Sequence, residues 1–425
     1  MNMIEKHESE VRSYCRNWPV SFERARGPLQ WDTEGNRYID FFSGAGSLNY
    51  GHNEPRLKQA LLDHLAADGV IHSLDMVTPA KERFLERFAE VILAPRGLDY
   101  KVQFPGPTGT NAVEAAMKLA RKATGRERIV SFTNAFHGMT LGALSVTGNN
   151  MKRGGAGVLL QSGTALPYCN YFGEEVDTTE YLDQLLEDDG SGLDLPAAVI
   201  VETVQGEGGM ATATMEWLRD LQTVCRKHEV LLIVDDIQAG CGRTGTFFSF
   251  EPAGIEPDIV TLSKSLSGFG LPFAVTLMKP ELDVWEPGEH NGTFRGHNPA
   301  FVTGTAALEF WRGEGLTPQV EAKAEKITRA LDQIAADHPV LEGELRGRGM
   351  FQGLACASDL AGKITAKAFE LGVLVETSGP EDEVVKLLPP LTIDDETLEE
   401  GLQLLTKAIV EVIATGKTQM AGQAV

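Results

Sequence analysis

The pattern of apolar and polar residues divides the chain into regions of different periodicity. Within residues 27–43, alternating apolar residues flank the turn-forming residues 32–36, which predicts a β-hairpin. Further along, segments of helical periodicity, such as residues 54–64 and 216–229, alternate with short runs that are apolar throughout. These runs are residues 197–201, 230–234, 259–262 and 274–278. Because a strand covered on both faces has no polar side, they predict a mainly parallel sheet between helices.

The pattern changes after about residue 305. Amphipathic helices are predicted at residues 319–336 and 364–371, on either side of residues 344–355, and a further helix at residues 396–413. This arrangement is typical of a smaller α/β unit packed beside a larger one. We therefore predict an N-terminal segment, residues 1–54, that joins the small domain. A large domain at residues 55–305 and a C-terminal small domain at residues 306–425 follow it.

The composition of the chain argues against nucleic-acid and membrane partners. The chain has 38 basic and 60 acidic residues, a formal net charge of −22. Proteins that bind a phosphate backbone need basic patches, so we expect no nucleic-acid partner. No apolar run approaches the roughly 18 residues that span a bilayer, and the first residues form no apolar core, so we expect a cytoplasmic protein with no membrane partner.

The five cysteines, at positions 15, 169, 225, 241 and 356, are scattered and include no CxxC pair. Their odd number and wide spacing argue against both a disulfide framework and a zinc site. We therefore predict no metal-binding residues from the sequence.

Acidic and basic side chains follow two of the predicted strands. Asp235 and Asp236 end the run at residues 230–234, and open α/β sheets bind ligands at the carboxyl ends of their strands. An isolated Asp pair more often caps a helix or lies in a surface turn, but the glycine-rich residues 237–245 are unlike a plain helix start. Lys264 follows the next predicted strand, 29 residues after Asp235. A lone lysine there is usually exposed, whereas a lysine and an acid at strand ends can converge on one crevice.

A third segment has the features of an anion-binding site. Residues 107–111, Pro-Thr-Gly-Thr-Asn, directly precede a predicted helix at residues 112–124. Backbone amides at a helix N-terminus, together with hydroxyl groups, bind anions, although the same residues also suit a simple helix cap. Pyridoxal 5'-phosphate (PLP) needs a lysine for its aldehyde, an acid for its pyridine nitrogen and donors for its phosphate. The three segments together therefore predict a PLP site.

Several motifs occur in one order along the chain. The strongest are residues 235–245 and 263–264, supported by residues 135–138, 202–209 and 388–391. Over roughly residues 27–412 these segments resemble the class III aminotransferases of PLP fold type I, the family that holds the ornithine, acetylornithine and 4-aminobutyrate aminotransferases. The resemblance implies an α/β fold. Its large domain would hold a mainly parallel seven-stranded sheet between helices, beside a smaller α/β domain.

The resemblance also implies roles for cofactor-binding residues. Lys264 would form the Schiff base with PLP and then act as general base and acid. Asp235 would pair with the pyridine nitrogen, Gln238 would hydrogen-bond the phenolic oxygen, and Phe136 would stack on the ring. Without the resemblance, Phe136 is as well explained as a core residue.

The phosphate would be held by Gly109 and Thr110. Thr293 is similar to a threonine that reaches the phosphate from a neighbouring subunit. The resemblance therefore implies a homodimer or higher homo-oligomer with shared active sites.

On the substrate side, the sequence departs from the family. Glu207 matches a glutamate that pairs with an arginine and releases it when a dicarboxylate enters, but Lys386 stands at the position of that arginine. Lysine neutralises a carboxylate without the bidentate fork. Met139 stands where some relatives carry a second carboxylate-binding arginine, and Ala45 where ornithine-specific relatives carry a tyrosine. These departures argue against ornithine, acetylornithine and 4-aminobutyrate as substrates.

A closer resemblance fits these departures. Residues 42–52, 104–109 and 292–298 are similar to the transaminases that form diaminobutyrate in ectoine synthesis. This implies a ping-pong reaction in which L-glutamate gives its amino group to L-aspartate 4-semialdehyde, yielding 2-oxoglutarate and L-2,4-diaminobutyrate. It also implies a potassium ion as a second cofactor and a source under osmotic stress, with which the acidic composition agrees.

Three alternatives stay open at the level of sequence. Another ω-aminotransferase, of the ornithine, acetylornithine or 4-aminobutyrate type, would share every cofactor residue and differ only in the pocket. An aminomutase or racemase on the same fold would need no external keto acid. A binding protein without catalytic activity would have no reason to keep Lys264, Asp235 and Gln238 together.

Overall fold

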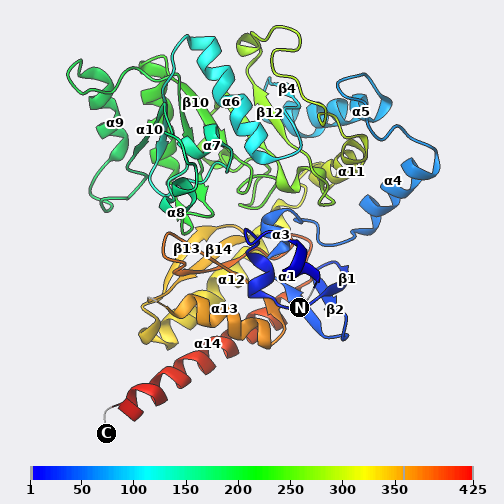
Figure 1. Cartoon of the computed structure of the whole chain (residues 1–425), viewed down its shortest axis with the longest axis vertical. Coiled ribbons are helices and arrows are strands. Elements are labelled where there is room, and N and C mark those ends of the chain that lie inside the picture. The colour runs from blue at the N-terminus through cyan, green and yellow to red at the C-terminus, as the bar shows by residue number, and fades with distance from the viewer. Residues whose placement is uncertain (1–2, 358, 424–425) are drawn as a thin grey trace.

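A computed structural model of the chain describes residues 3–357 and 359–423, and places the side chains up to residue 415. Figure 1 shows a larger unit above a smaller one, with the N-terminus beside the smaller unit and the last helix extending away from it. Within the described residues, no helix combines the length and the apolarity needed to cross a membrane.

The larger unit is built on a seven-stranded sheet in the order β4-β12-β11-β10-β7-β5-β6. Strands β11, β10, β7, β5 and β6 are parallel to one another, whereas β12 is antiparallel to both β11 and β4. The bounds are β4 Lys101–Gln103, β5 Ile129–Phe132, β6 Gly163–Leu166, β7 Ala198–Val201, β10 Leu231–Asp235, β11 Ile259–Leu262 and β12 Val275–Met278. The predicted mainly parallel seven-stranded sheet is confirmed.

The central strands are buried because helices cover the sheet. All residues of β5, β7, β11 and β12 are buried, as their unbroken apolar runs predict. The helices of this unit are α4 Pro55–Ala66, α5 Pro79–Phe88, α6 Gly109–Thr124, α9 Thr178–Glu187, α10 Met215–Lys227 and α11 Asn298–Leu308. The predicted helices at residues 54–64 and 216–229 correspond to α4 and α10.

The smaller unit contains an antiparallel sheet in the order β13-β14-β17-β16. Its elements are β13 Glu344–Arg348, β14 Phe351–Ala355, β16 Glu376–Ser378, β17 Val384–Leu387, α12 Thr317–Asp337, α13 Leu360–Glu370 and α14 Asp395–Gln423. The three predicted helices are present, but α14 continues ten residues beyond the predicted end at residue 413. Residues 414–423 contain two glycines, at 416 and 422, but no proline; glycine weakens a helix without removing its backbone hydrogen bonds, and the helix continues through this stretch.

The N-terminal strands lie against the smaller unit. The sheet β1 Phe22–Arg26, β2 Leu29–Asp32 and β3 Arg37–Asp40 is extended by β15 Val373–Leu374, which runs parallel to β3. Strands β2 and β3 are antiparallel, so the predicted hairpin is confirmed. Because β3 pairs with a strand from near the C-terminus, we propose domain boundaries near residues 54 and 305.

The remaining elements are short. The helices are α1 Met3–His7, α2 Tyr14–Asn17, α3 Ser43–Gly46, α7 Leu141–Ser145 and α8 Asn150–Gly154, and the strands β8 Val204–Gln205 and β9 Ala211–Thr212 pair with each other. Single helical turns are η1 Ala89–Leu93, η2 Ala94–Arg96, η3 Glu251–Ala253, η4 Lys264–Ser267, η5 Pro280–Leu282, η6 Glu309–Trp311 and η7 Pro339–Leu341. The turn η4 begins two residues after β11, so the sheet positions Lys264.

Candidate active site

A cavity of about 320 Å³ lies where the carboxyl ends of β10 and β11 meet the N-terminus of α6. Strands β10 and β11 are parallel neighbours, with Asp235 opposite Thr261. The acid at the end of β10 and the lysine after β11 therefore reach the same edge of the sheet. Six of the residues predicted to bind the cofactor line this cavity: Gly109, Thr110, Phe136, Asp235, Gln238 and Lys264.

One end of the cavity is the first turn of α6, which begins at Gly109 rather than at residue 112. The side chain of Asn111 accepts hydrogen bonds from the backbone N–H and the hydroxyl of Thr108, at 3.2 and 2.8 Å. This cap starts the helix three residues early and leaves N–H groups of its first turn for an anion. A Cβ on Gly138 would lie 2.3 Å from the Thr110 hydroxyl oxygen, so only glycine fits beside that hydroxyl.

At the carboxyl end of β10, Asp235 is buried and oriented by three donors. His137 Nδ1 lies 2.7 Å from Oδ2, and the Thr261 hydroxyl and the Ile237 N–H donate to Oδ1 at 3.1 and 3.2 Å. Burial lowers the pKa of His137, but the hydrogen bond and the charge of Asp235 outweigh it and the net shift is upward. The arrangement holds one carboxylate in a fixed position at the cavity wall.

A second buried acid, Glu202, lies beside this pair. Its Oε1 accepts a hydrogen bond of 2.8 Å from the N–H of Phe136, and burial raises its pKa to about 7. Sequence reasoning assigned no role to His137 or Glu202, although both stand in motifs that carried the family resemblance. His137 gives no signal of its own in the sequence, because its partner Asp235 is 98 residues away.

Lys264 opens the turn after β11 with a backbone φ of +43°. A positive φ is uncommon for a residue other than glycine and is often found at functional sites, where the surrounding fold maintains it. Burial lowers the pKa of the Lys264 amine, partly opposed by the charge of Glu207. A lysine with a lowered pKa is suited to nucleophilic and proton-transfer roles.

These residues fit PLP by the chemistry of their groups. The turn of α6 supplies donors for a phosphate, Asp235 an acid for a ring nitrogen, and Lys264 an amine for an aldehyde. Phe136 contributes an aromatic face at the cavity wall. All of them line one cavity, at the edge of the sheet where the strand ends converge.

Beside the cavity, Gln238 connects the cofactor pocket to the predicted substrate residues. Its Nε2 donates to the carbonyl of Ala45 at 3.0 Å and lies 3.4 Å from Oε1 of Glu207. The same Glu207 oxygen accepts a hydrogen bond of 2.9 Å from Nζ of Lys386. The charge of Lys386, which outweighs the opposing effect of burial, lowers the pKa of Glu207 to about 2.

Glu376, on β16, is a further partner of Lys386 that sequence reasoning missed. Its Oε1 lies 2.8 Å from Nζ of Lys386, as an ion pair whose geometry is not aligned for a hydrogen bond. Nothing in the local sequence connects Glu376 to Lys386, ten residues further on, since only the pairing of β16 with β17 brings the two together.

The other candidates lie elsewhere. The carbonyl of Thr293 is 2.7 Å from Nε2 of His72, and Thr293 does not line the cavity of its own chain, so its predicted role depends on a neighbouring subunit. Met139 lines the cavity and is half exposed. Arg243, in the glycine-rich segment 237–245, is fully buried and donates to the carbonyls of Met350 and Pro389. It therefore joins the two units rather than facing the cavity.

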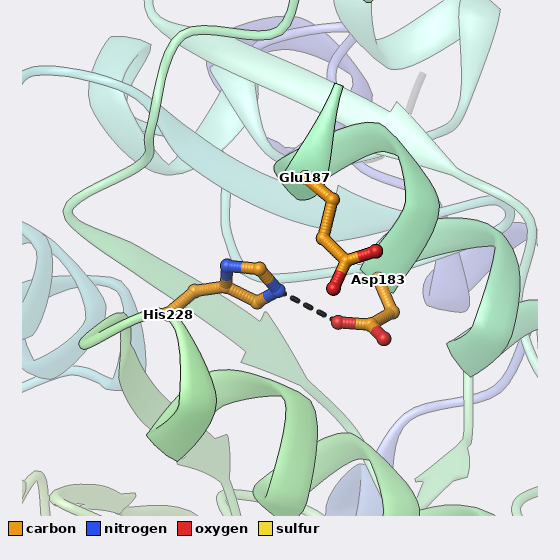
Figure 2. A group of neighbouring side chains, drawn as sticks. All are labelled: Asp183, Glu187 and His228. Carbon is orange, nitrogen blue, oxygen red and sulfur yellow. Dashed lines mark hydrogen bonds and ion pairs between the residues drawn. The ribbon is translucent and has the colours of Figure 1, made fainter. Parts of the chain in front are cut away.

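One group of side chains has the spacing of metal ligands. Asp183 and Glu187 on α9 lie beside His228 at the end of α10, with one ligand atom of each within 4.8 Å of the others (Figure 2). His228 Nε2 is 2.6 Å from Oδ1 of Asp183, and Lys227 forms ion pairs of 2.7 and 2.5 Å with the two carboxylates. Because Lys227 already pairs with both carboxylates, we describe this group as an ion-pair network that joins α9 to α10.

The class of the protein follows from this fold and site. The family model for class-III aminotransferases matches residues 12–409, and the chain belongs to that family. Two curated relatives have the same name, diaminobutyrate–2-oxoglutarate transaminase. The relative from Halalkalibacterium halodurans is 56% identical over 421 residues, with 99% of each chain covered. The relative from Streptomyces avermitilis is 60% identical over 414 residues, which is 97% of this chain and 98% of the relative.

Solved structures show the same fold. The ornithine aminotransferase from Toxoplasma gondii ME49 superposes with a TM-score of 0.85 at 27% identity, covering 97% of this chain and 94% of the other. An S-selective transaminase from Arthrobacter sp. superposes with a TM-score of 0.86 at 23% identity, covering 97% and 98%. The predicted fold type I architecture is therefore confirmed, and the family implies PLP as the cofactor.

Proposed function

We propose that this enzyme transfers the amino group of L-glutamate to L-aspartate 4-semialdehyde, giving 2-oxoglutarate and L-2,4-diaminobutyrate. The observation that carries the proposal is the near-complete similarity, at 56 to 60% identity, to relatives named diaminobutyrate–2-oxoglutarate transaminase. The pocket supports it, because Met139 and Ala45 stand where arginine and tyrosine serve other members of the family. The amino acid and keto acid substrates would be used in a ping-pong reaction.

We further propose which residues hold PLP. Gly109 and Thr110 would bind the phosphate, Asp235 the pyridine nitrogen, Gln238 the phenolic oxygen, and Phe136 one face of the ring. When bound, PLP supplies an electron sink for breaking bonds at the carbon that bears the amino group. The support for these assignments is the convergence of all five residues on one cavity.

The chain's own residues would then act on the substrate. Lys264 would hold the aldehyde through its amine and move the proton at the reacting carbon, a role that its lowered pKa supports. Asp235, kept in place by His137, would hold the ring nitrogen protonated. Glu207, paired with Lys386, would form the wall of the pocket at the part of the substrate that does not react, with Ala45 leaving room beside Gln238.

The assembly and location are also proposals. A homodimer or higher homo-oligomer with shared sites is supported by Thr293, which lies outside the cavity of its own chain, and by the exposed apolar side chains of Val70, Ile71 and Phe294. A cytoplasmic location is supported by the five cysteines, which are all free, as expected in a reducing compartment. A potassium requirement rests on the resemblance alone.

A half-reaction screen tests the proposal. The holoenzyme is mixed in turn with L-2,4-diaminobutyrate, L-ornithine, L-glutamate and 4-aminobutyrate, and the conversion of the bound cofactor to its amine form is followed by absorbance. We expect rapid conversion by L-glutamate and by L-2,4-diaminobutyrate. A clear preference for L-ornithine or 4-aminobutyrate would contradict the proposed substrate. Turnover of an amino acid without any added keto acid would instead indicate an isomerase.

A further inference from the structure

The ammonium group of Lys386 lies between two carboxylates. Its Nζ is 2.9 Å from Oε1 of Glu207 and 2.8 Å from Oε1 of Glu376, and it also donates to the carbonyl of Gly206 at 3.3 Å. The Lys386 side chain is fully buried. Three oxygens therefore lie within 3.3 Å of Nζ, so a substrate carboxylate can reach this ammonium only if one of these partners moves away.

The two carboxylates are held in different ways. Glu376 and Lys386 are directly opposite residues of the antiparallel strands β16 and β17, so their ion pair is part of the sheet. Glu207 reaches the lysine from the turn between β8 and β9. The Glu207 side chain is 23% exposed, whereas that of Glu376 is 5% exposed. Glu207 is therefore the member of the group that a substrate can meet.

The turn that carries Glu207 is itself fixed. The hydroxyl of Ser378, on β16, donates to the carbonyl of Gly206 at 2.6 Å and accepts from the N–H of Gly209 at 3.3 Å. A rearrangement at this site therefore involves the side chain of Glu207 rather than its backbone. Gln238, which lines the cavity with Lys264, contacts the same carboxylate and places it at the boundary with the cofactor pocket.

The charges of this group favour one kind of ligand. One ammonium and two carboxylates have a net charge of −1 when all are ionised. A substrate carboxylate that displaced Glu207 would meet a lysine still neutralised by Glu376. An ammonium bound to Glu207 would instead make the net charge of the buried group zero. Surroundings of low polarity strongly favour such a neutral group.

We propose that Glu376 determines substrate specificity: it neutralises Lys386 and so leaves Glu207 to receive the ammonium at the non-reacting end of a diamino acid. The inference rests on the proposed function, in which L-2,4-diaminobutyrate is that diamino acid. In this inference, Lys386 positions Glu207. This wall of the pocket then recognises an ammonium rather than a carboxylate of the substrate.

The variant Glu376→Gln tests the inference, because it keeps the shape of the side chain and removes one negative charge. With the holoenzyme, we expect KM for L-2,4-diaminobutyrate to rise by about tenfold or more, the effect of losing one charge-assisted contact. KM for L-glutamate should stay the same or fall, and kcat should change less than KM. An equal rise of KM for both amino acids would indicate a merely structural role and overturn the inference, as would no change.

A second variant restores the net charge of −1 by also removing the positive charge of Lys386. In Glu376→Gln combined with Lys386→Met, Glu376 and Lys386 are both replaced by uncharged residues, so Glu207 alone is charged and the group returns to a net charge of −1. We expect this double variant to recover affinity for L-2,4-diaminobutyrate relative to Glu376→Gln alone. A double variant that binds the diamino acid no better than the single variant would overturn the charge argument. Glu370→Gln, at an exposed ion pair on α13, is the matched control and should change neither KM.

Direct binding supplies a readout other than turnover. Titration calorimetry of L-2,4-diaminobutyrate into the pyridoxamine-phosphate form, which cannot react with an amine, should show weaker binding in Glu376→Gln. Titration of glutarate into the PLP form should show equal or tighter binding. The opposite pattern would contradict the inference.

The two proposals can fail separately. If the wild-type enzyme forms L-2,4-diaminobutyrate but Glu376→Gln treats both amino acids alike, only the inference about Glu376 is wrong. If the wild-type enzyme does not use L-2,4-diaminobutyrate at all, the proposed function is wrong and this inference falls with it.

Discussion

Nδ1 of His137 lies 2.7 Å from Oδ2 of Asp235, although the two residues are 98 positions apart in the chain. Both side chains are almost completely inaccessible to solvent. The contact joins the turn that carries Phe136 to the end of β10. It therefore orients the carboxylate that we propose as the partner of the cofactor ring.

Replacing His137 with glutamine should impair catalysis without preventing folding. The change removes a charge-assisted hydrogen bond to Asp235, and such bonds contribute about 1.5–3 kcal/mol, which corresponds to about 10- to 100-fold in kcat/KM. Steady-state assays with L-glutamate as amino donor measure the effect. The exposed His7 offers a control, and an unchanged kcat/KM in His137→Gln would show that Asp235 needs no such support.

Lys264→Ala should abolish amino transfer. The variant lacks the amine that would hold the cofactor aldehyde, so we expect loss of the visible absorbance of the bound cofactor and a fall of activity by several orders of magnitude. Absorbance spectra and a coupled assay for 2-oxoglutarate measure both effects. Lys101→Ala removes a more exposed lysine, paired with Asp283, and should behave as the wild type. Substantial activity in Lys264→Ala would refute the assignment.

Gly138→Ala should weaken retention of the cofactor. The new Cβ would lie 2.3 Å from the Thr110 hydroxyl oxygen, so the proposed phosphate site would have to shift. We expect loss of cofactor on dialysis, with a Kd raised by about tenfold or more. Gly157→Ala is a matched control because Gly157 also has a positive φ, of +68°, but has no atom within 4 Å of a new Cβ. Equal retention of the cofactor in both variants would show that the clash at Gly138 does not disturb the phosphate site.

Glu202→Gln should change how stability depends on pH. Burial raises the pKa of Glu202 from 4.5 to about 7, so between these values the folded state binds more protons than the unfolded state. The free energy of unfolding therefore falls as pH rises through this range, and the stabilisation is fully present only below pH 4.5. Glutamine stays neutral, so the variant should lose less stability from pH 4.5 to 7.5, by on the order of 3 kcal/mol at most.

Thermal unfolding of the cofactor-free protein at a series of pH values measures this difference. Glu216→Gln, at an exposed position of α10, should keep the wild-type slope. A parallel pH dependence in Glu202→Gln and the wild type would show that Glu202 is ionised throughout the range.

Local pattern was sufficient for the elements of the sheet. The apolar runs at residues 259–262 and 274–278 correspond to β11 and β12 within one residue, because strands buried on both faces contain few polar side chains. Helix ends were less well predicted. Helix α6 starts at Gly109 because the Asn111 side chain caps Thr108, and this depends on the orientation of one side chain rather than on periodicity.

The residues that we propose for PLP binding could be recognised without coordinates. Strand ends, a helix N-terminus and the order of the motifs pointed to Lys264, Asp235 and Gly109, since parallel strands bring their carboxyl ends to one edge whatever the details of packing. Sequence patterns did not predict the contacts between side chains that are far apart in the chain. His137 meets Asp235, and Glu376 meets Lys386, only because strand pairing and burial bring distant positions together. The reaction type is thus readable from motifs, whereas the charge that the pocket presents to its substrate depends on which buried groups the fold places side by side.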